Sequence, residues 1–191
     1  MEGLFYCFWF WYNFNMLLII LLFFLALALV LLFVIISEFV AFVRTRVPFV
    51  PTHAGDIEFI VKKLGITPGD VFYDLGSGNG KVVFLVEKLS GAKVTGFELG
   101  WWTILFAKLK AAMNKSKAKF IAKNFFKEDW SGANYIYGYL YPPLMGRIEE
   151  KFLADCKPGS IAIIRDFPFP NMPHSEKYFL PKKHEIYIYR K

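Results

Sequence analysis

With 191 residues, the chain has room for one domain of ordinary size and a short appendage, because single cores typically hold about 100 to 150 residues. It contains two cysteines, Cys7 and Cys156, which excludes a disulfide-stapled scaffold. The formal net charge of +7 belongs wholly to residues 47–191, and it suits nucleic acid, acidic protein or anionic lipid headgroups without choosing among them.

A long apolar segment comes first in the chain. Met16 to Ile36 is an unbroken run of 21 apolar residues, and a helix of about 20 residues crosses the hydrocarbon layer of a bilayer. A cleaved signal peptide is the alternative, but no basic region precedes the run and the run is longer than such segments usually are. The stretch before it predicts an interfacial aromatic belt, formed by Phe5, Tyr6, Phe8, Trp9, Phe10, Trp11, Tyr12 and Phe14.

Two arginines, Arg44 and Arg46, follow the apolar run. The positive-inside rule therefore predicts a single-pass membrane protein whose remaining chain lies in the cytoplasm. We expect residues 1–46 to form the transmembrane anchor with its juxtamembrane segment, and residues 47–191 to form one α/β domain.

Strands and helices alternate in that domain. Apolar spacing predicts a helix that ends at Gly65, a strand over 71–75, a helix over 81–89, a strand over 93–97 and a helix over 102–113. Strands around 120–121, over 134–140 and over 160–165 follow, with a helix over 144–154 before the last. Alternation of this kind predicts a parallel sheet. The final strands, over 176–180 and 184–189, predict an antiparallel hairpin because only a Pro-Lys-Lys turn separates them.

A glycine-rich loop joins the first strand of the domain to the next helix. It reads Asp74-Leu75-Gly76-Ser77-Gly78-Asn79-Gly80, and glycines at such a turn let the backbone approach a ligand that a Cβ would exclude. The dinucleotide-binding spacing GxGxxG would need glycine where Lys81 stands. A turn without a ligand is the alternative, but Glu98 ends the second strand, where a ribose-binding carboxylate belongs. A solvated surface glutamate is the other interpretation of that residue.

Asn124 follows the third strand and is placed to meet an adenine ring with its side-chain amide. Phe125 and Phe126 next to it can stack on that ring, or they can pack in the core instead.

From Val47 to the C-terminus the chain resembles the seven-β-strand protein lysine methyltransferases of archaea and, with a membrane-associated N-terminal segment, of mitochondria. The resemblance rests on four motifs in matching order: Val47-Pro48-Phe49-Val50-Pro51-Thr52, Tyr73 to Gly80, Gly96-Phe97-Glu98-Leu99 and Asn124-Phe125-Phe126. It implies a Rossmann-like class I methyltransferase fold with a mostly parallel seven-stranded sheet, S-adenosylmethionine as cofactor and a protein substrate, which can itself be a membrane protein. The implied cofactor-binding residues are Thr52, Asp74, Gly76, Ser77, Gly78, Gly80, Glu98 and Asn124, although Thr52 could equally cap a helix.

Three residues are candidates for the chemistry on a lysine. A lysine must be uncharged to accept a methyl group, so a carboxylate or phenol near an apolar channel would help. Tyr139, Tyr141 and Asp166 fit, and Asp166 lies where relatives carry an acid. Pairing of Asp166 with Arg165 or Lys182 at the surface is the alternative.

Departures from the family pattern bear on the substrate. Asn79, Lys81 and Gly100-Trp101 differ from the residues that the family commonly has, which affects the expected substrate more than cofactor binding. Tyr141-Pro142-Pro143-Leu144 lacks the leading amide or acid and the trailing aromatic of nucleic-acid amino-methylating enzymes, which argues against nucleic acid. A lipid or small-molecule methyltransferase and a non-catalytic membrane-anchored binding module remain the alternatives.

No metal site is predicted, because the histidines are far apart in sequence and only Cys156 lies in the α/β domain. We expect His53, His174 and His184 to be surface or packing residues.

Overall fold

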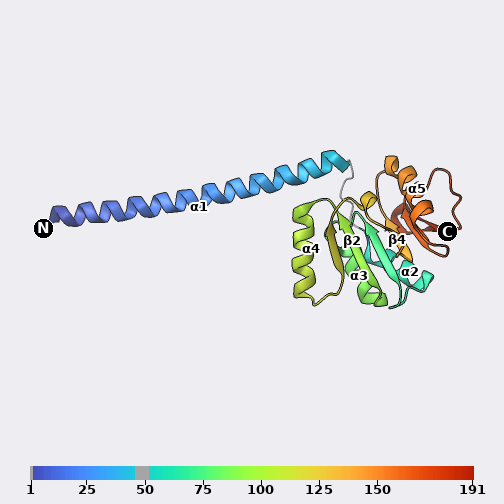
Figure 1. Ribbon diagram of the computed structural model, residues 1–191. Coiled ribbons are helices and arrows are strands. Elements are labelled where there is room, and N and C mark those ends of the chain that lie inside the picture. The colour runs from blue at the N-terminus through green and yellow to red at the C-terminus, as the bar shows by residue number, and fades with distance from the viewer. Residues whose placement is uncertain (1, 46–51) are drawn as a thin grey trace. The chain divides into compact units, whose positions relative to one another are not determined.

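The computed structural model describes residues 2–45 and 52–191, without the side chains of residues 2–14, 38, 41–45 and 182. The chain forms two compact units, Met1–Val40 and Ala41–Lys191 (Figure 1). The aromatic belt, the Arg44 side chain, Arg46 and the segment Val47 to Pro51 lie outside the described part. The expected division between residues 46 and 47 therefore stays a prediction.

The first unit belongs to one helix, α1 (Glu2–Thr45), which is 44 residues long. The sequence predicted a shorter one, but leucine, alanine, isoleucine and phenylalanine sustain a helix and no proline interrupts them. Within α1, Asn15–Ser37 is a 23-residue stretch long and apolar enough to cross a membrane, and none of its most apolar window is buried inside the molecule. Length and composition allow a membrane span or a signal sequence.

The second unit is built on a seven-stranded sheet with the order β3-β2-β1-β4-β5-β7-β6. Strands β1 to β5 run parallel, and β7 runs antiparallel between β5 and β6. The expected Rossmann-like, mostly parallel sheet and its closing hairpin are thus confirmed. The strands are β1 (Val71–Leu75), β2 (Lys93–Glu98), β3 (Lys119–Ala122), β4 (Tyr135–Gly138), β5 (Ile161–Arg165), β6 (Glu176–Phe179) and β7 (Glu185–Arg190).

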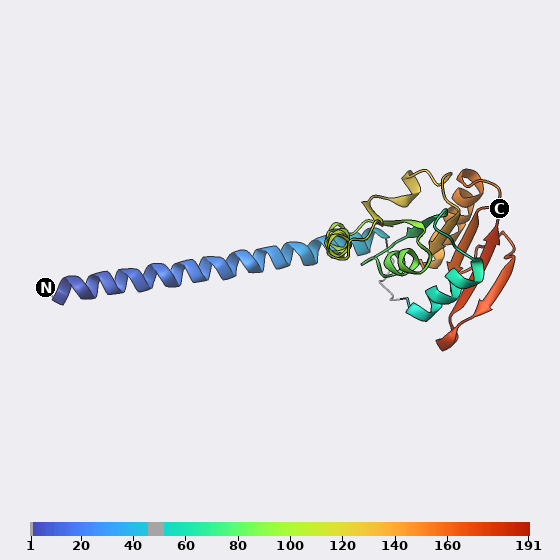
Figure 2. The ribbon, with the colours of Figure 1, turned by 90° about the horizontal axis from the view of Figure 1, so that it is seen from below.

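Helices cover both faces of the sheet (Figure 2). One face packs against α2 (Ala54–Leu64), α3 (Lys81–Ser90) and α4 (Trp101–Met113), and the other against α5 (Met145–Asp155). Side chains alternate between the two cores along each strand, as strand geometry requires. In β5, for example, Ile161 and Ile163 face the first core while Ala162 and Ile164 face the second. The sheet is thus buried on both sides, and polar side chains can gather at the carboxyl ends of its strands.

Strand β4 ends at Gly138, two residues earlier than the sequence predicted. The short 3₁₀ helix η2 (Pro142–Leu144) follows, because two consecutive prolines cannot donate to a ladder. Leu140 turns its side chain into the second core and is almost fully buried. Tyr139 and Tyr141 therefore leave the sheet at its carboxyl end.

Candidate functional site

The glycine-rich loop connects β1 to α3, and its three glycines have positive φ angles: 78° at Gly76, 51° at Gly78 and 79° at Gly80. A Cβ on Gly76 would lie 2.8 Å from the Leu140 side chain, and a Cβ on Gly80 would lie 2.6 Å from the Phe120 ring. Packing within the protein therefore requires glycine at both positions, in addition to the left-handed backbone. Approach of a ligand, which the sequence suggested for all three, remains an argument for Gly78.

Hydrogen bonds fasten this loop to the end of β2. The amides of Gly76 and Ser77 both donate to the Phe97 carbonyl, each at 2.9 Å. Glu98 comes next, and its Oε2 accepts from the Gly78 amide at 3.0 Å. Its Oε1 accepts from the amides of Leu99 at 2.7 Å and Gly100 at 3.0 Å. The two sequence motifs thus form one structure at the tips of neighbouring strands.

Below the loop, Asp74 is 2% exposed and its Oδ2 has no hydrogen-bond partner among the described residues. Burial and the nearby charge of Glu98 raise the pKa of Asp74 to about 8. The Ser77 hydroxyl is likewise buried without a partner there. Buried polar atoms normally have partners, so this pair suits a site that receives a polar ligand.

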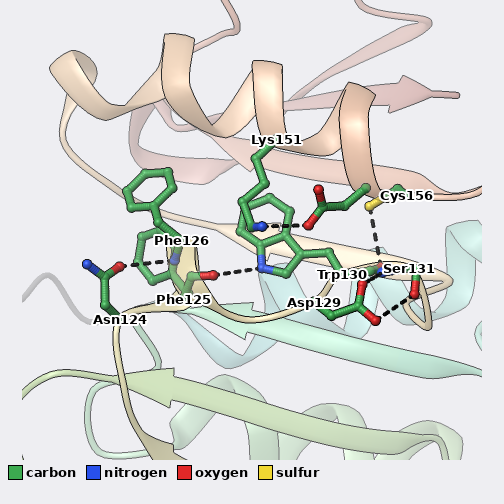
Figure 3. A network of polar contacts seen from close by, with 9 residues as sticks. Asn124, Phe125, Phe126, Asp129, Trp130, Ser131, Lys151 and Cys156 are labelled. Atoms are coloured by element: carbon green, nitrogen blue, oxygen red, sulfur yellow. Dashed lines mark hydrogen bonds and ion pairs between the residues drawn. The ribbon is translucent and has the colours of Figure 1, made fainter.

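Asn124 begins the segment after β3 (Figure 3). Its Oδ1 accepts from the Phe126 amide at 3.0 Å and caps the 3₁₀ helix η1 (Phe125–Lys127). The Phe125 carbonyl accepts from Trp130 Nε1 at 3.0 Å, which fixes the segment against the second core. In the close-up, the amide nitrogen of Asn124 points away from Phe126, so this cap does not use it.

The two phenylalanines after Asn124 differ in their surroundings. Phe125 belongs to the second core, so it is a packing residue. Phe126 packs against the same core and carries the Arg147 guanidinium 4.1 Å from its ring centre. Core packing, the alternative that the sequence left open, describes Phe125 well.

Thr52 is buried at the start of the second unit, and its hydroxyl lies 3.3 Å from the Tyr137 hydroxyl. The N-cap of α2 is His53, which makes no capping hydrogen bond through its side chain. The helix-capping interpretation of Thr52 was therefore wrong. Tyr137 pairs with Asp74 in the register of β4 with β1, so Thr52 contacts a residue of the strand next to the loop's own strand.

A second polar cluster lies at the carboxyl end of β5. Asp166 Oδ2 is 2.8 Å from His184 Nδ1, and its Oδ1 accepts from the Glu185 amide at 2.8 Å. The Tyr139 ring meets the His184 ring edge to face at 6.3 Å. Burial raises the pKa of Tyr139, and a hydrogen bond to Asp166 raises it further. Two of the three predicted catalytic residues are thus neighbours.

Tyr141 differs from those two residues. It is 43% exposed at the start of η2, and no described hydrogen bond joins it to Tyr139 or Asp166. Its catalytic role stays a prediction.

Arg165 lies behind the cluster and is 1% exposed. Its Nη1 forms an ion pair with Asp56 Oδ2 of α2 at 2.6 Å, and its guanidinium lies 4.8 Å from the Tyr139 ring centre. The alternative pairing of Asp166 with Arg165 is a longer contact, at 3.9 Å, and the alternative partner Lys182 has its side chain outside the described part. This buried pair joins α2 to β5 beneath Tyr139.

His184 is the residue that sequence reasoning missed. Its distance from Asp166 along the chain hid the contact, although the predicted hairpin contained the signal. Because β7 runs antiparallel to β5, the residue before β7 must lie beside the residue after β5. His53 also comes near, with its ring 6.5 Å from that of His184. Among the described residues, no group of three or more His, Cys, Asp or Glu side chains is arranged to hold a metal ion.

The sequence was compared with known protein families and proteins. Residues 74–176 match the family model described as the ANTKMT methyltransferase domain. Over 129 residues the chain is 27% identical to the Mus musculus adenine nucleotide translocase lysine N-methyltransferase, covering 66% of this chain and 56% of that protein. It is 24% identical over 150 residues to a protein-lysine N-methyltransferase of Saccharolobus islandicus (strain REY15A), covering 75% of this chain and 93% of that one.

Solved structures share the fold. An RNA methyltransferase from Salinibacter ruber, in complex with S-adenosyl-L-homocysteine, superposes with a TM-score of 0.70 at 23% identity, covering 74% of this chain and 93% of that one. A methyltransferase from Geobacter sulfurreducens, in complex with the same molecule, gives 0.54 at 21% identity, over 68% of this chain and 50% of that one. At these identities the likeness concerns the fold alone.

Proposed function

This chain belongs to the ANTKMT methyltransferase domain family, and we propose that it is an S-adenosylmethionine-dependent methyltransferase that acts on lysine side chains of a protein. One observation supports the binding of this cofactor most directly. Glu98 accepts a hydrogen bond from the Gly78 amide at 3.0 Å, near the buried Asp74 and at the carboxyl ends of two parallel strands. Nucleosides bind at such strand tips in doubly wound sheets.

The residues of the loop fit this cofactor. An ionised carboxylate offers about four acceptor sites, and three backbone amides fill three of those of Glu98. Binding both ribose hydroxyls therefore requires the release of one of these amides. The oxygens of Asp74 and Ser77 that lack a partner among the described residues would serve the polar amino-acid moiety. The bound cofactor supplies an activated methyl group to a nitrogen acceptor.

The cluster at the end of β5 suits a lysine acceptor. The ammonium group must lose a proton, against a reference pKa of about 10.4. Asp166 holds His184 through Nδ1, and with a proton on Nδ1 the acceptor nitrogen of the ring is Nε2, which would take the proton from the lysine. The Tyr139 ring provides an aromatic wall beside it. The names of the Mus musculus and Saccharolobus islandicus relatives support the same substrate class.

Membrane anchoring is a further part of the proposal. The segment Asn15–Ser37 contains the unbroken apolar run Met16 to Ile36, and none of its most apolar window is buried inside the molecule. A bilayer is therefore the environment in which these side chains would be stable. The placing of the catalytic unit in the cytoplasm rests on Arg44 and Arg46.

One experiment tests the activity. The full chain, in lipid vesicles, is incubated with a lysine-rich protein and cofactor carrying a labelled methyl group, and methyl-lysine is sought after hydrolysis. Gly78→Arg should abolish both cofactor binding and labelling, because a long side chain would fill the space in which the cofactor is proposed to approach the loop's backbone. Gly69→Arg, at the opposite end of β1, is the matched control and should retain both.

Other outcomes point elsewhere. Label in the lipid extract or in added RNA would replace the lysine proposal. Cofactor binding without any labelled product would favour a non-catalytic binding module. Melting curves of both variants establish that each still folds cooperatively.

A further inference from the structure

Helix α4 has an unusual outward face. Its inward side chains, Ile104, Ala107 and Ala111, pack in the first core beside β2 and β3. On the outside, where an amphipathic helix of a soluble domain carries polar residues, large apolar side chains are exposed. Phe106 is 63% exposed and Met113 is 84% exposed, and Trp101 and Leu109 are exposed with them. Figure 2 looks along this helix at the margin of the catalytic unit.

Lysines surround these apolar residues. Residues 99–123 contain six lysines and no acidic residue. Those at 108, 110, 115, 117 and 119 are exposed. The Lys110 amine lies 5.1 Å from the ring centre of Phe84 in α3. Glu87 of α3 is the acid that approaches, and it accepts from the Ser116 hydroxyl and the Lys117 amide. The face therefore combines apolar bulk with positive charge.

We propose that this face of α4 docks on a membrane surface that carries anionic lipid headgroups. Helices with aromatic and aliphatic residues on one side and lysines beside them lie in the bilayer interface, where burial of apolar area and attraction to anionic lipid act together. The inference rests on the proposed membrane span in α1.

The short length of chain between the span and the α/β unit, residues 52–191, supports a membrane surface as the partner of this face. The span ends at Ser37, α1 continues as a helix to Thr45, and the described chain resumes at Thr52. The eight helical residues 38–45 and the six residues 46–51 at full extension reach at most about 40 Å. A catalytic unit on so short a tether meets the bilayer surface at high effective concentration, so weak contacts suffice for docking.

Other partners fit this face less well. RNA would use the lysines and could stack bases on Trp101 or Phe106, but Leu109 and Met113 offer no flat ring for a base. A second copy of the chain would bring two lysine-rich faces together, which like charges oppose.

The test uses the full chain in vesicles of phosphatidylcholine and phosphatidylglycerol. Met113→Cys, in a Cys7→Ser background, receives an environment-sensitive dye; Cys156 is buried and stays unlabelled. The matched site is Leu153→Cys on α5, an exposed apolar position on the opposite face of the sheet. Nitroxide-bearing lipids should quench the dye at position 113 at least about threefold more than at position 153, since only α4 would enter the interface.

Two further variants separate the contributions. Phe106→Ser combined with Leu109→Ser should remove most of the quenching at 113. Lys108→Gln combined with Lys110→Gln should lower the equilibrium constant for docking about fivefold for each lysine in anionic vesicles, with little effect in pure phosphatidylcholine. Leu89→Ser, an exposed apolar residue of α3, is the control and should change nothing.

Equal quenching at 113 and 153 overturns the proposal, and so does a dye response to single-stranded polyuridylate in place of vesicles. Alkaline carbonate extraction tests the span separately. A chain that resists extraction but shows equal quenching refutes docking alone, whereas a chain found wholly in the soluble fraction refutes both. Methyl transfer measured in detergent reports on the activity independently of either result.

Discussion

The two ends of the sheet's carboxyl edge are built differently. At β1 and β2 the groups come from one short stretch, Asp74 to Gly100, and backbone amides make most of the contacts. At β5 and β7 the cluster joins Asp56, Tyr139, Arg165, Asp166 and His184 from separate elements through side chains. The group at β1 and β2 is thus formed by residues close together in sequence. The group at β5 and β7 is formed by residues that only the tertiary structure brings together. Changes in the first group should therefore act on cofactor binding, and changes in the second on turnover and stability.

The largest effect is expected at the tertiary end. His184→Gln keeps a hydrogen-bonding side chain beside Asp166 but cannot take up a proton near neutral pH, so the methyl-transfer rate should fall by about 10²- to 10⁴-fold. Cofactor affinity should not change, and the alkaline dependence of the rate should become steeper. His174→Gln, on an exposed histidine, is the control. An unchanged pH–rate profile would remove His184 from the chemistry.

The buried ion pair comes next. Asp56→Ala removes the close partner of the buried Arg165 charge and leaves only the longer contact to Asp166 that is described above, which should lower the free energy of unfolding by about 3 to 5 kcal/mol. Glu58→Ala, on the exposed side of the same helix, should have little effect. Urea unfolding of both variants gives the comparison, and a loss equal to that of the control would contradict a supporting role for the pair.

At the local end, Glu98→Ala removes a charged acceptor at the proposed ribose site. Cofactor binding should weaken by about 1.5 to 3 kcal/mol, measured by calorimetry. Glu150→Ala, on the exposed side of α5, should bind as the parent does. If both variants bind the cofactor equally well, Glu98 is not a cofactor-binding residue.

The last prediction concerns Asp74 and the pH dependence of the free energy of unfolding. Its pKa is raised from 3.8 to about 8 in the folded state, so the folded chain holds a proton that the unfolded chain releases. The associated stability is present below the unfolded pKa and is lost as the pH rises through the folded value. Asp74→Asn should remove this loss, so the variant's stability should fall less between about pH 5 and about pH 8 than the parent's. Parallel pH curves would show that Asp74 is not buried as a neutral acid.

The sequence by itself determined what depends on near neighbours. Alternating strands and helices follow from apolar periodicity and turn residues, and the loop's glycines and Glu98 lie on consecutive elements whose order fixes where they meet. The apolar length of Asn15–Ser37 is likewise a property of the sequence alone.

Only the tertiary structure decided the rest. It showed that Gly76 and Gly80 are required by Leu140 and Phe120, residues that no local pattern pairs with them. In the tertiary structure His184 contacts Asp166, and Arg165 forms an ion pair with Asp56. These contacts form because an antiparallel strand and a helix distant in sequence both pack against β5. The tertiary structure also left one side of α4 uncovered. Periodicity predicts that a helix has a buried face, but which apolar side chains remain exposed depends on how many faces the sheet can cover.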